Sequence, residues 1–110
     1  MQELQRVVAG TADHLGLHGT APALALTLQA RLGALAAEIE RATETGRRPF
    51  RGTPAWETLL GDVGFALLNL ADQTGVDIDR AIRIAADRLY RGGMQPPQQR
   101  TDREAWPFSE

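Results

Sequence analysis

Hydrophobic residues along this chain recur at the spacing of α-helices rather than of β-strands. The densest stretch spans residues 57–75, where apolar side chains fall three or four positions apart on one face: Leu59, Leu60, Val63, Leu67, Leu70 and Ala71. Phe65 and Leu68 add apolar surface on the opposite side. Because a helix that is apolar nearly all round must be covered on several sides, we expect this segment at the centre of the fold.

Start and stop signals divide the chain into four expected helices, over residues 2–15, 23–45, 54–74 and 78–91. Thr20 precedes Pro22, the order of a capping residue followed by a proline suited to the first helical turn. Thr53 and Pro54 repeat that order. The stop signals are glycines, at Gly16, Gly46 and Gly75. No segment alternates apolar and polar residues for long enough to indicate a strand.

The sequence therefore predicts an all-α fold, with a four-helix domain over residues 1–91 and a Pro/Gln-rich tail over residues 92–110. Four helices of this size do not suffice to cover the apolar segment at 57–75, so we expect a homo-oligomer, most simply a dimer. In the tail, Trp106 and Phe108 are candidates for docking on a neighbouring subunit or a partner, or for packing on the same subunit.

Composition narrows the possible chemistry. The 110 residues include no cysteine, and all 12 basic residues are arginine, which excludes lysine and thiolate nucleophiles and zinc–thiolate sites. A net charge of −2 gives no electrostatic reason to expect nucleic acid or an anionic membrane surface as a partner. No apolar run suits a membrane span, and the N-terminus lacks a signal-peptide pattern, so we expect a cytoplasmic protein.

Asp62 is the first candidate for chemistry because it interrupts the apolar segment. Between residues 59 and 71, only Asp62 and Asn69 have side chains that hydrogen-bond strongly. We expect the Asp62 carboxylate to be held largely out of water, where it needs a partner, a proton or a metal ion. An arginine or the Thr58 hydroxyl would serve as a structural partner.

Two segments carry a resemblance to a known family. LGDVGFALLNLADQTGVDIDRAI, residues 60–82, resembles the second metal-binding helix and the start of the last helix in the MazG-like all-α nucleoside triphosphate pyrophosphohydrolases. LALTLQARLGALAAEI, residues 24–39, resembles their first metal-binding helix. The resemblance covers roughly residues 1–91 and implies a four-helix subunit that oligomerises. In active members, Glu-x-x-Glu and Glu-x-x-Asp on facing helices hold Mg²⁺, which grips the triphosphate and orients an attacking water.

This chain departs from the family pattern at the metal site. The first carboxylate pair aligns with Arg31 and Ala34, and the second aligns with Leu59 and Asp62, so Asp62 alone keeps a carboxylate. Our leading hypothesis is therefore a non-catalytic member of the family, with binding, regulatory or structural roles and no expected cofactor. An ion pair between Arg31 and Asp62 would replace the metal, without implying added stability, because desolvation offsets most of the attraction.

The last helix also departs from the family pattern. The lysine and asparagine that active members direct toward the nucleotide align here with Ala85 and Ala86, or with Arg88 in a shifted register. Arg88 is thus the one candidate for a substrate-binding residue on this helix. A nucleotide and a protein partner both remain open as the molecule that the chain recognises.

A relocated metal site is the alternative hypothesis. Asp62, with Glu38 and Glu57 at displaced positions, would hold Mg²⁺, and the chain would be an active (d)NTP pyrophosphohydrolase that releases pyrophosphate. Solvated helix ends are the structural explanation for the same glutamates. A third hypothesis is a four-helix protein whose resemblance reflects common Ala/Leu packing alone.

Two polar clusters complete the candidate sites. The loop at residues 46–54 carries three arginines that suit phosphates or an acidic protein surface, although such loops are more commonly just solvated: Arg47, Arg48 and Arg51. His14 and His18 lie four residues apart on either side of an expected helix end. This position indicates an exposed terminus and loop rather than a metal-binding pair.

Overall fold

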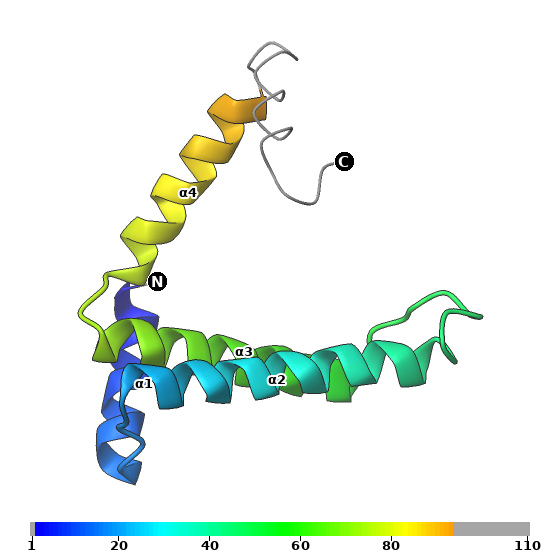
Figure 1. Ribbon diagram of the computed structural model, residues 1–110, viewed down its shortest axis with the longest axis horizontal. Coiled ribbons are helices and arrows are strands. Elements are labelled where there is room, and N and C mark those ends of the chain that lie inside the picture. The colour runs from blue at the N-terminus through cyan, green and yellow to red at the C-terminus, as the bar shows by residue number, and fades with distance from the viewer. Residues whose placement is uncertain (1, 94–110) are drawn as a thin grey trace. The chain divides into compact units, whose positions relative to one another are not determined.

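The computed structural model describes residues 2–93, which form four helices and no strand (Figure 1). The helices are α1 (Gln2–Leu15), α2 (Ala21–Ala42), α3 (Pro54–Gln73) and α4 (Ile78–Gly93). The predicted all-α class is confirmed for this part of the chain. No helix among these residues is long and apolar enough to cross a membrane. Trp106 and Phe108, the docking candidates of the tail, lie outside the described residues.

The predicted threonine caps start two of the helices. Thr20 Oγ1 accepts a hydrogen bond of 3.3 Å from the Ala23 amide at the start of α2. Thr53 Oγ1 accepts one of 3.2 Å from the Trp56 amide at the start of α3. Each bond satisfies an amide that has no partner within its own helix, and a proline occupies the first turn in both cases.

Three helix boundaries differ from the prediction by two or more residues, and one of them is the start of α2, at Ala21 instead of residue 23. Helix α2 ends at Ala42 rather than at residue 45, and the next residues enter the left-handed region, with φ of 50° at Glu44, 62° at Thr45 and 88° at Gly46. The Thr43 hydroxyl donates to the Ile39 carbonyl at 2.7 Å and accepts from the Gly46 amide at 3.1 Å, which stabilises this turn. Helix α4 continues to Gly93 instead of ending near residue 91.

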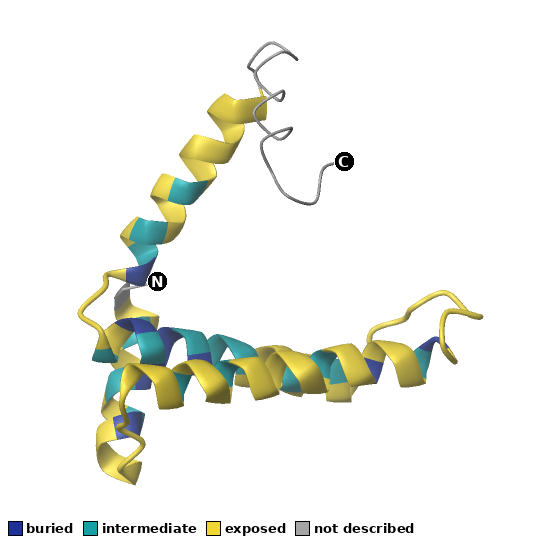
Figure 2. Cartoon of the chain, viewed as in Figure 1, coloured by how far each residue is buried: buried dark blue, intermediate teal, exposed yellow. Residues whose placement is uncertain are grey.

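Helices α1, α2 and α3 pack into one compact unit that comprises residues 1–78. Helices α2 and α3 lie side by side in opposite directions, and α1 packs across α3 (Figure 1). The buried apolar residues belong to α1, to the C-terminal half of α3 and to the start of α4: Val8, Ala12, Ala66, Leu68, Ala71 and Ile78 (Figure 2). The C-terminal half of α3 is thus the centre of the fold, as its apolar pattern predicts.

The apolar stripe along α2 is only partly covered. Leu24, Leu28 and Leu35 are half-buried, whereas Leu32 is 48% exposed and Ile39 is 42% exposed. A helix that contacts a single neighbour buries a narrow strip, so residues at the edges of a wide apolar face stay in solvent. Among the described residues no large side chain is fully buried, and only the small Ala12 reaches 0% exposure, which leaves this unit with a thin core.

A glutamine side chain joins α1 to the segment that follows α3. Gln5 Nε2 donates to the Val76 carbonyl at 2.8 Å, and Gln5 Oε1 accepts from the Ile78 amide at 3.1 Å. Both polar ends of one side chain are therefore satisfied by the backbone of a single short connection. This pair of bonds fixes the turn after Gly75, whose φ of 75° favours glycine.

Helix α4 belongs to the second unit, which begins at Asp79. Ion pairs one turn apart line its polar side: Arg83 Nε lies 2.8 Å from Asp79 Oδ2, and Arg91 Nε lies 3.0 Å from Asp87 Oδ2. Several large apolar side chains of α4 are exposed, up to 70% for Leu89. The helix is thus amphipathic, with charged residues along one side and apolar residues along another.

Candidate functional site

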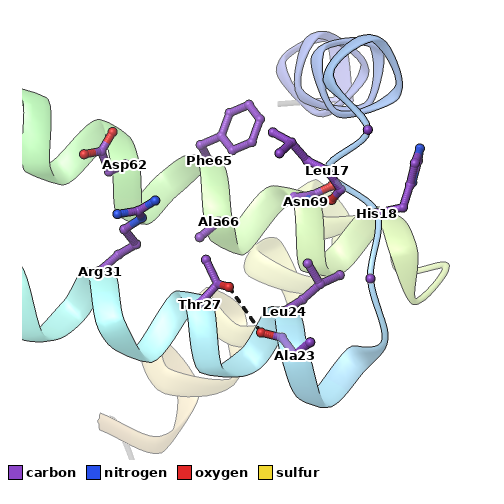
Figure 3. Close-up of a pocket in the computed structure, with 12 residues that line it drawn as sticks. Leu17, His18, Ala23, Leu24, Thr27, Arg31, Asp62, Phe65, Ala66 and Asn69 are labelled. Atoms are coloured by element: carbon purple, nitrogen blue, oxygen red, sulfur yellow. Dashed lines mark hydrogen bonds between the residues drawn. The ribbon is translucent and has the colours of Figure 1, made fainter.

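A hollow of about 400 Å³ lies between α2, α3 and the loop that joins α1 to α2, and we call it the α2/α3 pocket (Figure 3). Its lining comprises Gly16, Leu17, His18, Gly19, Ala23, Leu24, Thr27, Arg31, Asp62, Phe65, Ala66 and Asn69. A volume of this size lies within the range of small-molecule sites. The pocket combines one cation, one carboxylate and a mostly apolar wall, so it suits a ligand with both polar and apolar parts.

Arg31 and Asp62 enter this pocket from facing helices. Arg31 extends from α2 toward the part of α3 that bears Asp62 (Figure 3). Both side chains are exposed, so the expectation of a buried Asp62 is wrong. Helix α1 crosses α3 near its C-terminal end, so within residues 1–78 the N-terminal half of α3, which bears Asp62, has α2 as its neighbour (Figure 1).

The predicted ion pair between Arg31 and Asp62 is not formed. The ion pairs of the described residues join other side chains, and none connects Arg31 with Asp62 within 4.0 Å. Neither side chain makes a hydrogen bond with another described residue. The Arg31 guanidinium and the Asp62 carboxylate thus line one pocket, and both remain available for hydrogen bonds to solvent or to a ligand.

Asn69 is the buried polar residue of the pocket, with 5% of its surface exposed. Its Nδ2 donates to the Leu17 carbonyl at 3.1 Å, which ties the α1–α2 loop to α3. Its Oδ1 is the one buried side-chain atom of the described residues without a hydrogen-bond partner. An unsatisfied buried acceptor costs about 1–3 kcal/mol, so a donor that reached Oδ1 would stabilise the occupied pocket.

His18 lies at the loop end of the pocket between two polar side chains. Its Nε2 is 2.7 Å from Asp13 Oδ1, and its Nδ1 is 2.7 Å from Gln73 Nε2. In the neutral ring, a proton on Nε2 would let the ring donate to the carboxylate and accept from the glutamine amide. These contacts hold the ring as a structural part of the loop, and His14 is exposed at the end of α1.

Glu38 is engaged elsewhere, at the far end of α2. It is 9% exposed and accepts hydrogen bonds from Arg41 Nε at 3.0 Å and from Arg41 Nη2 at 2.6 Å. Thr53 Oγ1 donates to the same carboxylate at 3.4 Å, which links the end of α2 to the start of α3. The hydrogen bond from Arg41 holds the pKa of the Glu38 carboxyl below its ordinary value of 4.5, although burial opposes this effect.

The structure does not bring Asp62, Glu38 and Glu57 together. Glu57 is exposed near the start of α3, and among the described residues no group of three or more His, Asp or Glu side chains is placed to hold a metal ion. Within the described residues of one chain, the three carboxylates of the relocated Mg²⁺ site are therefore not grouped. Glu38 is better explained as a structural carboxylate that joins α2 to the α3 cap.

The other candidate residues are not among those that line the pocket. Arg88 is exposed on α4, in the second unit. In the basic loop, Arg48 Nη2 lies 3.1 Å from Glu44 Oε2, which indicates a solvated ion pair. The Phe50 and Trp56 rings meet edge to face, with centroids 4.7 Å apart, so Trp56 packs against the loop.

Sequence reasoning missed the roles of Asn69, His18 and Gln73. The sequence signal for Asn69 was present, because an amide in an apolar helix needs a partner when it is buried. No signal identified the α1–α2 loop as that partner, since contacts between residues 52 positions apart depend on the tertiary fold.

No protein-family model matches this chain, and no significant match is found among curated proteins or among solved structures.

Proposed function

We propose that this chain is a non-catalytic binding protein with the helix arrangement of the MazG-like pyrophosphohydrolases, and that it takes a small ligand in the α2/α3 pocket without a metal ion. One observation carries the proposal. Arg31 and Asp62, which the resemblance aligns with metal-site positions on two facing helices, line the same pocket. The resemblance is thus geometrically consistent, although one of the two positions now bears a cation.

The charge of the pocket argues against triphosphate chemistry. The family mechanism needs several carboxylates that hold Mg²⁺ against the negatively charged phosphates. Among the lining residues Asp62 is the only carboxylate, and Arg31 carries the opposite charge 31 positions earlier in the chain. With one charge of each sign, this lining favours ligands of low net charge over a polyanion.

Exposed apolar surface supports the oligomer that is part of this proposal. On α2, Leu26, Leu32 and Ile39 are all exposed, and α1 exposes Leu4 and Val7. Exposed apolar side chains in this number on a small helical unit favour an interface between protein chains. We propose a homodimer in which a second copy covers part of this surface.

A turnover assay tests the proposal. Purified chain is incubated with a panel of (d)NTPs and Mg²⁺ or Mn²⁺, and inorganic phosphate is measured after a coupled pyrophosphatase. We expect no release above that of a heat-treated sample. In calorimetric titrations without nucleotide, we expect neither Mg²⁺ nor Mn²⁺ to bind at Asp62. The heats of titration should therefore be the same for the parent and for Asp62→Asn.

Two results would contradict the proposal. Turnover that repeats across independent preparations and disappears in Asp62→Asn would establish the relocated-carboxylate enzyme instead. Glu3→Gln is the matched control, because Glu3 is exposed on α1, does not line the pocket and belongs to neither hypothesis for the site. If Asp62→Asn and Glu57→Gln both abolished turnover, the carboxylates would meet in an assembly of several chains.

A further inference from the structure

We propose that the ligand of the α2/α3 pocket is a zwitterionic small molecule, one that carries an ammonium and a carboxylate group on an apolar body, as free amino acids do. This inference rests on the proposed function, because it names the ligand class of the same pocket. Three features of the lining carry it: a pair of unengaged opposite charges, an apolar wall and a buried acceptor without a donor.

The two opposite charges of the pocket determine which charged groups the ligand carries. Arg31 and Asp62 both line the pocket, and neither bonds to another described residue. A guanidinium binds a carboxylate through two parallel N–H donors, and a carboxylate accepts hydrogen bonds from an ammonium group. A zwitterion satisfies both side chains at once, whereas an anion or a cation alone would meet one attractive and one repulsive charge.

The apolar residues of the lining determine the uncharged part of the ligand. Leu24 of α2 and Phe65 and Ala66 of α3 all line the pocket (Figure 3). The hollow of about 400 Å³ exceeds what a charged head group alone would occupy. A hydrocarbon or aromatic side chain would therefore cover this wall and remove its apolar surface from water.

Asn69 supplies an independent observation. It is 5% exposed, lines the pocket, and leaves Oδ1 without a donor while Nδ2 is held by the Leu17 carbonyl. An N–H or O–H group on the ligand side chain is the matching partner. Amino acids with a side-chain donor are therefore expected to bind more tightly than those of similar size without one.

A second hollow provides the matched control. It is lined by Arg6 and Asp72, an exposed arginine and an exposed aspartate, but it lacks an aromatic ring and an unsatisfied buried amide. Substitutions of Arg6 and Asp72 change the net charge of the chain by the same amounts as substitutions of Arg31 and Asp62, but they do not alter the α2/α3 pocket. They separate an effect of net charge from an effect of the site.

The experiment is calorimetric titration of the full chain with L-phenylalanine, L-tryptophan and L-glutamine. The matched analogues are 2-phenylethylamine, which lacks the carboxylate, and 3-phenylpropanoate, which lacks the ammonium. We expect each analogue to bind at least roughly tenfold more weakly than L-phenylalanine, because a hydrogen bond to a charged group is lost. Arg31→Ala and Asp62→Asn should weaken the zwitterion similarly, and Arg6→Ala and Asp72→Asn should not.

Exchanging the charges at positions 31 and 62 tests directly whether these two side chains bind the zwitterion. Arg31→Asp and Asp62→Arg should each abolish zwitterion binding, whereas the double variant should restore it, with the ligand reversed. Because both positions are exposed, these variants are expected to keep the parent circular-dichroism spectrum and melting curve, which are measured in parallel.

The outcomes separate this inference from the proposed function. Binding of a mononucleotide or nucleoside, weakened by Arg31→Ala, would overturn the zwitterion class and leave a binding protein. Zwitterion binding that Arg31→Ala and Asp62→Asn leave unchanged would overturn the assigned pocket. If the zwitterions and a mononucleotide all fail to bind at millimolar concentration, the ligand class is overturned; repeated (d)NTP turnover would overturn the proposed function.

Discussion

Glu38 shows how one carboxylate acts at the scale of a residue. It is held by two donors of Arg41 and by the Thr53 hydroxyl, and Thr53 also caps α3. The sequence placed Glu38 near the polar end of α2 but did not predict its burial. Its contact with Thr53, 15 residues later, depends on the tertiary fold. The contacts of Glu38 and Thr53 lead to two predictions.

The first prediction concerns pH. The pKa of Glu38 is lowered in the folded chain, so its contribution to stability is present above the ordinary value of 4.5 and is lost as the pH falls through the lower folded value. Glu38→Gln should therefore flatten the loss of stability below pH 4.5, measured as denaturation midpoints against pH. Glu57→Gln, which removes an exposed carboxyl group, is the control, and a slope for Glu38→Gln no flatter than that of this control would contradict the assignment.

The second prediction compares two helix caps. Thr53→Ala removes the bond to the Trp56 amide and the bond to Glu38, so it should destabilise the chain by about 1–2 kcal/mol in chemical denaturation. Thr20→Ala removes only the bond to the Ala23 amide and should destabilise it by about 0.5–1 kcal/mol. A larger loss at Thr20 would show that the link between α2 and α3 contributes little.

At the scale of elements, the sequence predicted the helices and both threonine caps because these depend on neighbouring residues. It misplaced the end of α2, where the Thr43 hydroxyl bonds to the Ile39 carbonyl and the chain turns into the left-handed region. It also predicted a buried Asp62. Burial depends on how many helices cover a face, and α1 crosses α3 at its other end, so within residues 1–78 the start of α3 has α2 as its neighbour (Figure 1).

A third prediction tests this uneven coverage of α3. Leu68 is buried in the half that α1 and α2 cover, and Leu60 is 46% exposed in the other half. Leu68→Ala should lower the free energy of unfolding by about 2–5 kcal/mol, because it removes buried apolar contacts and leaves a cavity. In dilute protein, Leu60→Ala should change it by about 0.5 kcal/mol or less. Comparable losses at both positions in dilute protein would contradict the packing described here.

At the scale of the whole molecule, the thin core and the exposed apolar residues lead to a fourth prediction. Sedimentation velocity should detect a homodimer whose population rises with protein concentration. Leu26→Gln and Leu32→Gln, at exposed positions on α2, should shift the population toward monomer while the helical content is kept. Glu40→Gln, at an exposed polar site on the same helix, is the control. A monomer at every concentration would overturn the proposed dimer.

The double hydrogen bond of Gln5 makes one backbone proton a reporter of tertiary structure. The amide of Ile78, the first residue of α4, has no partner within its own helix and donates to a side chain of α1. Its hydrogen–deuterium exchange should therefore follow the release of α1 rather than the fraying of α4. In Gln5→Ala, this single amide should exchange at the rate of an open terminus, while amides in the middle of α3 keep their protection.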